Sequence, residues 1–269
     1  MGAFLCAGYR LAQIRPACRP IACGDTADRR LAMCKHICEG GVTMDIKTES
    51  NMKPILTLDK LISEAVLFCD RESKVNHKEL IGVTDGKAVG TYVEHKFQGQ
   101  LINNYVVTIG CSAKGIDLPD DDILTDIKVT SIVQPQSSCP FKNARQKIYG
   151  LGYNLLVFVY NKTDTADYCS LKFTHCTFVN KERTSDYTFT KRLIEMLKDG
   201  ANKEDIIGFL QDKNVPGDEL VYNELADEIM RNTPLQGYLT ISNALQWRLQ
   251  YGRVISLNNQ IDGIVNYEY

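Results

Sequence analysis

The stretch GIDLPDDDILTDIKVTS, residues 115–131, decides the fold of this chain. Apolar and polar residues alternate near its end, which predicts a β-strand over residues 125–133. Asp126 and Lys128 are two residues apart, so they project from the same face of that strand. A short preceding strand carries Asp117, and the two strands predict a hairpin in which Asp117 meets the other two side chains.

These three side chains predict a metal site. Two carboxylates, Asp117 and Asp126, that converge at the open end of a sheet form an oxygen-rich site suited to Mg2+, which also accepts substrate phosphate oxygens. Lys128 can orient or help to deprotonate an attacking water and offset charge in the transition state. The alternative is that residues 120–122 form a solvated acidic turn and that Lys128 is an ordinary exposed lysine.

The rest of the chain predicts a mixed α/β core followed by helices. Helical periodicity and short β-rich runs divide it into segments. Core helices are predicted at residues 54–69, 87–103 and 142–151, and core strands at 105–109, 154–160 and 171–179. Further helices are predicted at residues 189–198, 203–211, 219–230 and 242–251. The order predicts an α/β fold, a mixed central sheet flanked by helices, with a helical C-terminal lobe over residues 187–269.

Composition excludes several classes of protein. The 269 residues are 44% hydrophobic and 24% charged, which is typical of a globular chain and not of a disordered one. The longest apolar run, residues 155–160, is far too short to span a membrane. The chain has neither a Walker phosphate loop nor a dinucleotide fingerprint, so a nucleotide cofactor is not expected. With a formal charge of −2, any contact with nucleic acid requires a local basic face.

Residues 1–43 differ in composition from the remainder. They hold five of the ten cysteines and five arginines against one lysine. The cysteine spacing is a poor match to a zinc site, and interrupting arginines make a secretory signal a poor fit, whereas a mitochondrial-type presequence stays open. The codons for Glu39–Val42 can contain a bacterial ribosome-binding sequence a few bases before the codon for Met44, so we expect translation to start at Met44. A genuine N-terminal arm is the alternative.

The order of these features resembles the PD-(D/E)-x-K nuclease superfamily. Glu94 lies on a predicted helix before the hairpin, and a basic helix and a buried strand follow it. In the resemblance Asp126 matches the last acid of the motif, Lys128 its lysine and Asp117 its first acid, with Asp120 as a competing match. The hairpin is similar to that of the methyl-directed mismatch-repair nicking endonuclease, although it is slightly longer and has Asp where Glu is usual.

The resemblance implies a bacterial type II restriction endonuclease with a restriction-endonuclease-like fold. It implies a nuclease core over residues 44–186, Mg2+ as cofactor, double-stranded DNA as substrate, a homodimer and a cytoplasmic location. Asp117 and Asp126 would bind the metal, whereas Lys128 and Glu94 would complete the catalytic set. Water activated by the metal would hydrolyse a phosphodiester bond.

Three segments are predicted to contact DNA. Amides and hydroxyls of a loop after the lysine can bind phosphates or bases, and basic side chains on the next helix can bind phosphates. The C-terminal helix can read bases with amides and arginine. The predicted contacts are Gln134, Gln136, Ser137, Ser138, Lys142, Arg145, Gln246, Arg248 and Arg253. The alternatives are a plain polar loop, a solvated helix face and a helix that only caps the core.

Two rival functions remain open from the sequence. The first is a non-catalytic DNA-binding protein that uses the C-terminal helices as a helix-turn-helix-like module. The second is an interaction protein whose nuclease site has decayed. Metal-dependent cleavage of unmethylated plasmid into discrete fragments would favour the endonuclease over both.

Overall fold

The computed structural model describes residues 53–110, 115–139, 142–242 and 248–269. These residues belong to one compact unit, Asn51–Tyr269. The predictions for residues 1–43, including a start at Met44, lie outside the described residues. None of the described helices is long and apolar enough to cross a membrane.

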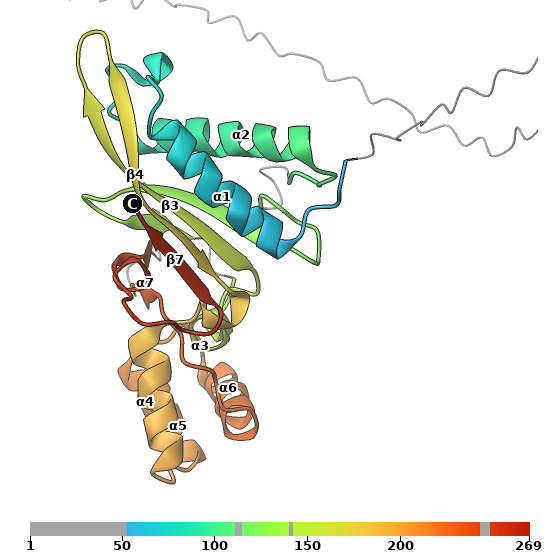
Figure 1. Ribbon diagram of the computed structural model, residues 1–269. Coiled ribbons are helices and arrows are strands. Elements are labelled where there is room, and N and C mark those ends of the chain that lie inside the picture. Colours follow the sequence, from blue (N-terminus) through green and yellow to red (C-terminus); the bar gives the residue numbers. More distant parts are fainter. Residues whose placement is uncertain (1–52, 111–114, 140–141, 243–247) are drawn as a thin grey trace, which may run out of the picture. The chain divides into compact units, whose positions relative to one another are not determined.

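The described residues contain seven α-helices, two short 3-10 helices (Lys78–Leu80 and Lys181–Arg183) and seven strands. Figure 1 shows their arrangement. The helices are α1 (Leu58–Glu72), α2 (Gly86–Asn104), α3 (Arg145–Tyr149), α4 (Tyr187–Lys198), α5 (Lys203–Asp212), α6 (Glu219–Arg231) and α7 (Gly252–Ile255). The strands are β1 (Thr125–Ser131), β2 (Gln136–Ser138), β3 (Asn154–Asp164), β4 (Cys169–Val179), β5 (Thr240–Ile241), β6 (Arg248–Gln250) and β7 (Ile264–Glu268). The predicted mixed α/β class is confirmed.

The central sheet has four strands in the order β1-β3-β4-β7. β1 runs parallel to β3, and the other neighbours are antiparallel, so the sheet is mixed. Residues 154–160 of β3 are all buried, as the apolar run NLLVFVY predicts for a central strand. β1 therefore forms one edge of the sheet and β7 the other.

Alternate residues of β3 enter two different cores. Leu156 and Phe158 pack with α1 and α2 on one face, whereas Leu155 and Val157 pack on the other face with β5, β6 and α7. A third core joins α3 to α4, α5 and α6, the helices that lie together at one end in Figure 1. The face of β3 from which a side chain projects thus decides which layer it meets.

The helix predicted at residues 242–251 is wrong in its described part. Within the predicted helix 242–251, residues 248–250 form strand β6, which pairs with β2 and β5. β7 then joins the central sheet beside β4. The buried Leu249 between two exposed neighbours is the period-two pattern of a strand, and β2 supplies its hydrogen bonds.

Two smaller differences lie near the hairpin. The predicted helix over residues 142–151 is limited to the five residues of α3. Residues 116–118 form only an isolated bridge, between Leu118 and Thr125, instead of a full strand. The bridge nevertheless closes the expected antiparallel turn, because the backbone amides of both residues donate to each other's carbonyl oxygens.

We expect Phe158→Ala to lower the free energy of unfolding by about 3–5 kcal/mol. The Phe158 ring is fully buried, with its centroid 5.1 Å from that of Phe97 and 5.6 Å from that of Phe68. Urea denaturation followed by circular dichroism measures the change. Leu220→Ala, at an exposed position on α6, is the control and should change stability by less than about 0.5 kcal/mol. Equal losses for both variants would contradict the core assignment.

Candidate active site

Helix α2 lies along the edge strand β1 and presents Glu94 beside it. The helix begins at the N-cap Asp85, whose side chain accepts hydrogen bonds from two backbone amides. Val93 and Phe97 are buried in the same core as Ile127 of β1, so this face of the helix lies against the strand. A Cβ atom on Gly90, one turn before Glu94, would lie 3.8 Å from that of Val129. This side of α2 is therefore in contact with the strand that follows the hairpin.

Asp126 and Lys128 lie together on β1, as their spacing predicts. Lys128 Nζ is 2.6 Å from Asp126 Oδ2. Their register partners on β3 are Leu155 and Val157, which face the second core. Asp126 is only 3% exposed, whereas the Lys128 side chain is 22% exposed. The carboxylate is thus fixed and the ammonium can reach solvent or a substrate.

Asp117 is held against the same strand. Its Oδ2 accepts a hydrogen bond of 2.7 Å from the backbone amide of Ile127, the residue between Asp126 and Lys128. Asp120 is engaged elsewhere, because its Oδ2 accepts a hydrogen bond of 3.0 Å from the backbone amide of Thr108. The geometry therefore favours Asp117 over Asp120 as the first acid of the site.

The carboxylates of this site interact electrostatically. Burial, together with the nearby charge and hydrogen bond of Asp117, raises the pKa of Glu94 to about 7. Burial chiefly raises the pKa of Asp126 to about 7, although the charge of Lys128 opposes that change. A bound cation would reduce the electrostatic repulsion among Glu94, Asp117 and Asp126.

The carboxylate oxygens of this site suit a hard cation that takes its other ligands from water or substrate. Among the residues that the structure describes, no three His, Cys, Asp or Glu side chains form a ready-made metal site. Mg2+ does not require such a cage, since it is usually bound by one or two carboxylates plus waters and substrate phosphates. Asp117 and Asp126 supply carboxylate oxygens of that kind beside the same backbone segment.

A cleft of about 710 Å³ opens between α2, β1 and the β2–β6 pair. Glu94 and Lys128 line it on one side. The predicted DNA-contacting residues along it are Gln134, Gln136, Ser137, Ser138 and Arg248. Segments more than 100 residues apart in the sequence thus meet in one cleft, although Arg248 reaches it from a strand and not from a helix.

The comparisons with known proteins identify the family. The NspV type II restriction enzyme family matches residues 55–266. This chain belongs to that family. The type II restriction enzyme NspV of Nostoc sp. (strain ATCC 29411 / PCC 7524) is 54% identical over 213 residues, which are 78% of this chain and 96% of the relative. No solved structure matches the chain. The predicted class, a type II restriction enzyme, is confirmed.

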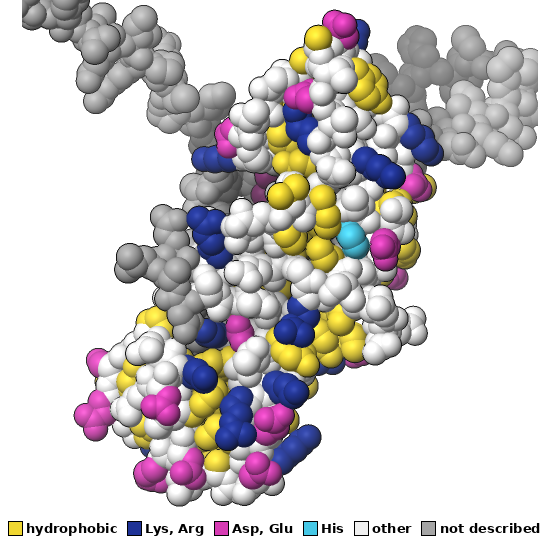
Figure 2. All heavy atoms as spheres, turned by 90° about the vertical axis from the view of Figure 1, so that its left-hand side faces the viewer, with side chains coloured by type: hydrophobic (Ala, Val, Ile, Leu, Met, Phe, Trp, Pro, Cys, Tyr) yellow, Lys and Arg dark blue, Asp and Glu magenta, His cyan; other side chains and the backbone are white. Residues whose placement is uncertain are grey.

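Other predicted DNA contacts of this NspV family member lie away from the cleft or outside the described residues. The Arg145 guanidinium is bonded to Glu228, with its Nη2 2.7 Å from Oε1, and the Arg253 guanidinium lies 3.8 Å from the centroid of the Tyr187 ring. Lys142 is exposed at the start of the segment before α3. Gln246 is not among the described residues. On the face drawn in Figure 2, Lys and Arg side chains are interspersed with Asp and Glu.

Two further residues support the site and were missing from the sequence predictions. Gln98 Nε2 donates to Glu94 Oε1 over 3.2 Å, one turn further along α2. Thr130 Oγ1 accepts a hydrogen bond of 3.1 Å from the backbone amide of Gln136, which ties β1 to β2. The period of the strand could have identified Thr130, because it is two residues beyond Lys128 and thus on the same face.

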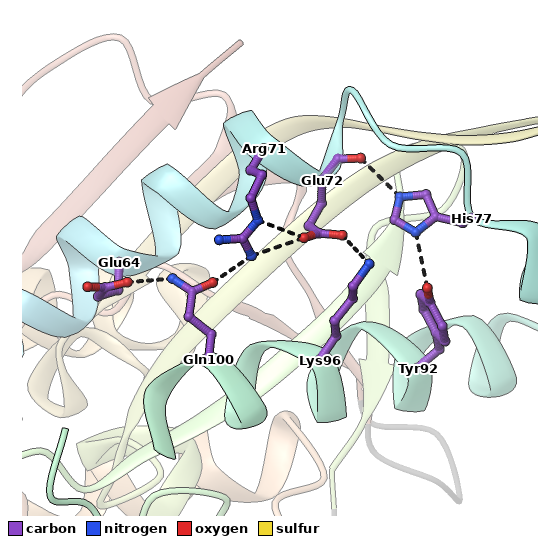
Figure 3. Close-up of polar contacts among 7 residues, drawn as sticks. All are labelled: Glu64, Arg71, Glu72, His77, Tyr92, Lys96 and Gln100. Atoms are coloured by element: carbon purple, nitrogen blue, oxygen red, sulfur yellow. Dashed lines mark hydrogen bonds and ion pairs between the residues drawn. The ribbon is translucent and has the colours of Figure 1, made fainter. Parts of the chain in front are cut away.

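A polar network joins α2 to α1 and fixes the helix that carries Glu94 (Figure 3). Glu72, on α1, is 3% exposed, and its Oε2 lies 2.5 Å from Lys96 Nζ. Its Oε1 accepts from Arg71 Nε over 3.0 Å. His77 connects the backbone carbonyl of Glu72 to the Tyr92 hydroxyl at 2.9 and 3.3 Å. Removing one partner from such a network leaves a buried charge uncompensated, which is destabilising.

We expect Glu72→Gln to lower the free energy of unfolding by about 1–3 kcal/mol, because it keeps the side-chain volume but weakens two ion pairs around a buried group. The control is Glu195→Gln, whose exposed partner Arg192 is 3.7 Å away. That change should cost less than about 0.5 kcal/mol. Chemical denaturation measures both. A smaller loss for Glu72→Gln than for Glu195→Gln would contradict a structural role for the network.

Proposed function

We propose that this restriction enzyme hydrolyses double-stranded DNA at the edge of β1. Membership of the family makes the chain a sequence-specific DNA endonuclease. In the proposal Asp117 and Asp126 bind the metal, Lys128 acts on the attacking water, and Glu94 supports the site directly or through water. The observation that carries it is the Asp126–Lys128 pair at 2.6 Å beside Asp117, with Lys128 and Glu94 lining the same cleft.

The proposed metal is Mg2+. Type II restriction enzymes generally need a divalent metal, and the hard oxygens of Asp117 and Asp126 suit Mg2+. When bound there it supplies positive charge that stabilises negative charge developing on the phosphate. The raised pKa values of Glu94 and Asp126 support this choice, because crowded carboxylates gain from a nearby cation.

Lys128 has the second role in the mechanism. Its ammonium is anchored by Asp126 but one-fifth exposed, so it can donate to an attacking water or to a phosphate oxygen from a fixed position. A cation at this point offsets charge in the transition state. Glu94, held by Gln98, faces the same cleft and can accept a hydrogen bond from that water.

We further propose that the fold is that of the PD-(D/E)-x-K nucleases. The order of α2, the hairpin with Asp117, β1 with Asp126 and Lys128, α3 and β3 supports this proposal. DNA would lie along the cleft, with phosphate contacts from Lys142, Arg145 or Arg253 as further proposals. A homodimer is the expected assembly, because a two-fold protein can present two sites to a two-fold DNA sequence.

We expect Asp126→Asn and Lys128→Ala each to lower the single-turnover rate of DNA cleavage at least about 100-fold while leaving the fold intact. The first removes a negative charge at nearly constant volume, and the second removes the ammonium. Rates are measured on plasmid with saturating Mg2+, and circular dichroism checks folding. Controls are Asp121→Asn in the exposed turn and Lys172→Ala on an exposed position of β4. Wild-type rates for Asp126→Asn or Lys128→Ala would reject the site.

Comparison of Asp117→Asn with Asp120→Asn decides which acid binds the metal. We expect the first to abolish cleavage, because Asp117 contacts the backbone between the two catalytic residues. The second should only reduce stability or rate modestly, because its carboxylate caps the amide of Thr108. Titration of Mg2+ in the cleavage assay separates weaker metal binding from misfolding. An active Asp117→Asn beside an inactive Asp120→Asn would reverse the assignment.

A further inference from the structure

The small sheet in the order β2-β6-β5 has one apolar and one polar face. On β6, Leu249 is buried between the exposed Arg248 and Gln250. Strand register pairs Gln136 with Gln250 and Ser138 with Arg248, so these four side chains share the outer face. The outer face is therefore built from amides, a hydroxyl and one guanidinium.

We propose that the two-stranded ribbon β2–β6 is the base-reading element of this enzyme. Arg248 contacts a guanine, and Gln250 together with Gln136 contacts an adenine, in the major groove of the DNA. The inference rests on the proposed cleft, but it assigns recognition to a strand pair where the sequence predicted a helix. Gln250 is a new candidate for specificity.

The outer-face groups are available for a ligand. Among the residues that the structure describes, none forms a hydrogen bond or ion pair with the guanidinium of Arg248 or with the side-chain amides of Gln136 and Gln250. Arg145, by contrast, is bonded to Glu228. An exposed arginine beside the cleft that has no acidic partner among the described residues can offer its guanidinium donors to DNA.

The chemistry of the ribbon fits bases better than phosphates. Phosphate-binding surfaces depend on lysine and arginine, whereas three of the four outer side chains here are neutral. A glutamine amide offers a donor and an acceptor that match N7 and N6 of adenine, and arginine matches O6 and N7 of guanine. The major groove also admits a two-stranded ribbon.

The ribbon is attached firmly to the catalytic strand. Leu249 is fully buried, and the Ser137 hydroxyl lies 2.5 Å from the hydroxyl of the buried Tyr251. Thr130, two residues after Lys128, is hydrogen bonded to the backbone of Gln136. A base bound on the ribbon is therefore held at a fixed distance from the phosphate at Lys128.

The test is the base preference of cleavage. The recognition site is first mapped by digesting a sequenced plasmid, and kcat/KM is then measured on the cognate duplex and on all its single-base-pair variants. We expect Arg248→Ala and Gln250→Ala to lose about 10- to 100-fold on the cognate duplex. Discrimination should be lost at one G·C pair for the first variant and at one A·T pair for the second, with the other positions unchanged.

Matched variants separate base reading from other roles. Arg248→Lys keeps the charge but loses the two-pronged guanidinium, so it should lose discrimination as Arg248→Ala does. Gln211→Ala, on an exposed position of α5, should leave both rate and preference unchanged. The salt dependence of DNA binding should be the same for Gln250→Ala and wild type, because no phosphate contact is removed.

Two results would overturn the assignment. The first is uniform weakening on every duplex with a reduced salt slope, which identifies phosphate contacts. The second is behaviour of Arg248→Ala and Gln250→Ala equal to that of Gln211→Ala. Failure of the proposed active site is recognised separately, because an Asp126→Asn enzyme that cuts normally contradicts the catalytic assignment without changing the base preference of the ribbon variants.

Discussion

The parallel pairing of β1 with β3 is the constraint on which the rest of the structure depends. β3 is buried on both faces, so it fixes the position and pleat of β1 through a continuous register from Thr125 to Ser131. That pleat directs Asp126 and Lys128 to one face, whereas Ile127 enters the core beneath α2. Among the described strands β3 alone pairs with β1 in the central sheet, and residues 127–131 of β1 line the cleft.

Two groups of elements pack beside the edge strand β1 and support it. α2 approaches β1 with Glu94 and is fixed to α1 by the buried Glu72. β2 leaves β1 by a short turn and is fixed through Thr130 and the small sheet. The proposed catalytic residues Glu94 and Lys128 and the proposed base-reading side chains Gln136 and Arg248 therefore line one cleft from regular secondary structure elements. Burial raises the pKa of Asp126, because it disfavours the charged form of the carboxylate.

Local periodicity in the sequence was sufficient to predict much of this arrangement. The apolar run at 154–160 predicted β3, the helical spacing around Glu94 predicted α2, and the two-residue spacing predicted the contact between Asp126 and Lys128. These features depend on neighbours in the sequence or on a strand that is buried on both faces. The type II restriction enzyme class followed from the same residues through a family resemblance and is confirmed by family membership.

Long-range pairing could not be predicted in the same way. Ile241 and Leu249 are eight residues apart, a spacing that places both on one side of a helix. The structure pairs them directly as partners in β5 and β6. Their burial depends on contacts such as Ser137 with Leu249, across more than 100 residues. Tertiary contacts thus override the helical pattern of the local sequence.

Metal binding by Asp117 and Asp126 is tested most directly by anomalous diffraction from crystals of the enzyme bound to DNA and Mn2+. This cation has the same preference for oxygen ligands as Mg2+. We expect an anomalous peak within about 2.5 Å of carboxylate oxygens of both Asp117 and Asp126, next to a phosphate of the DNA. A peak at the acidic turn of residues 120–122, or a DNA duplex bound away from the edge of β1, would contradict it.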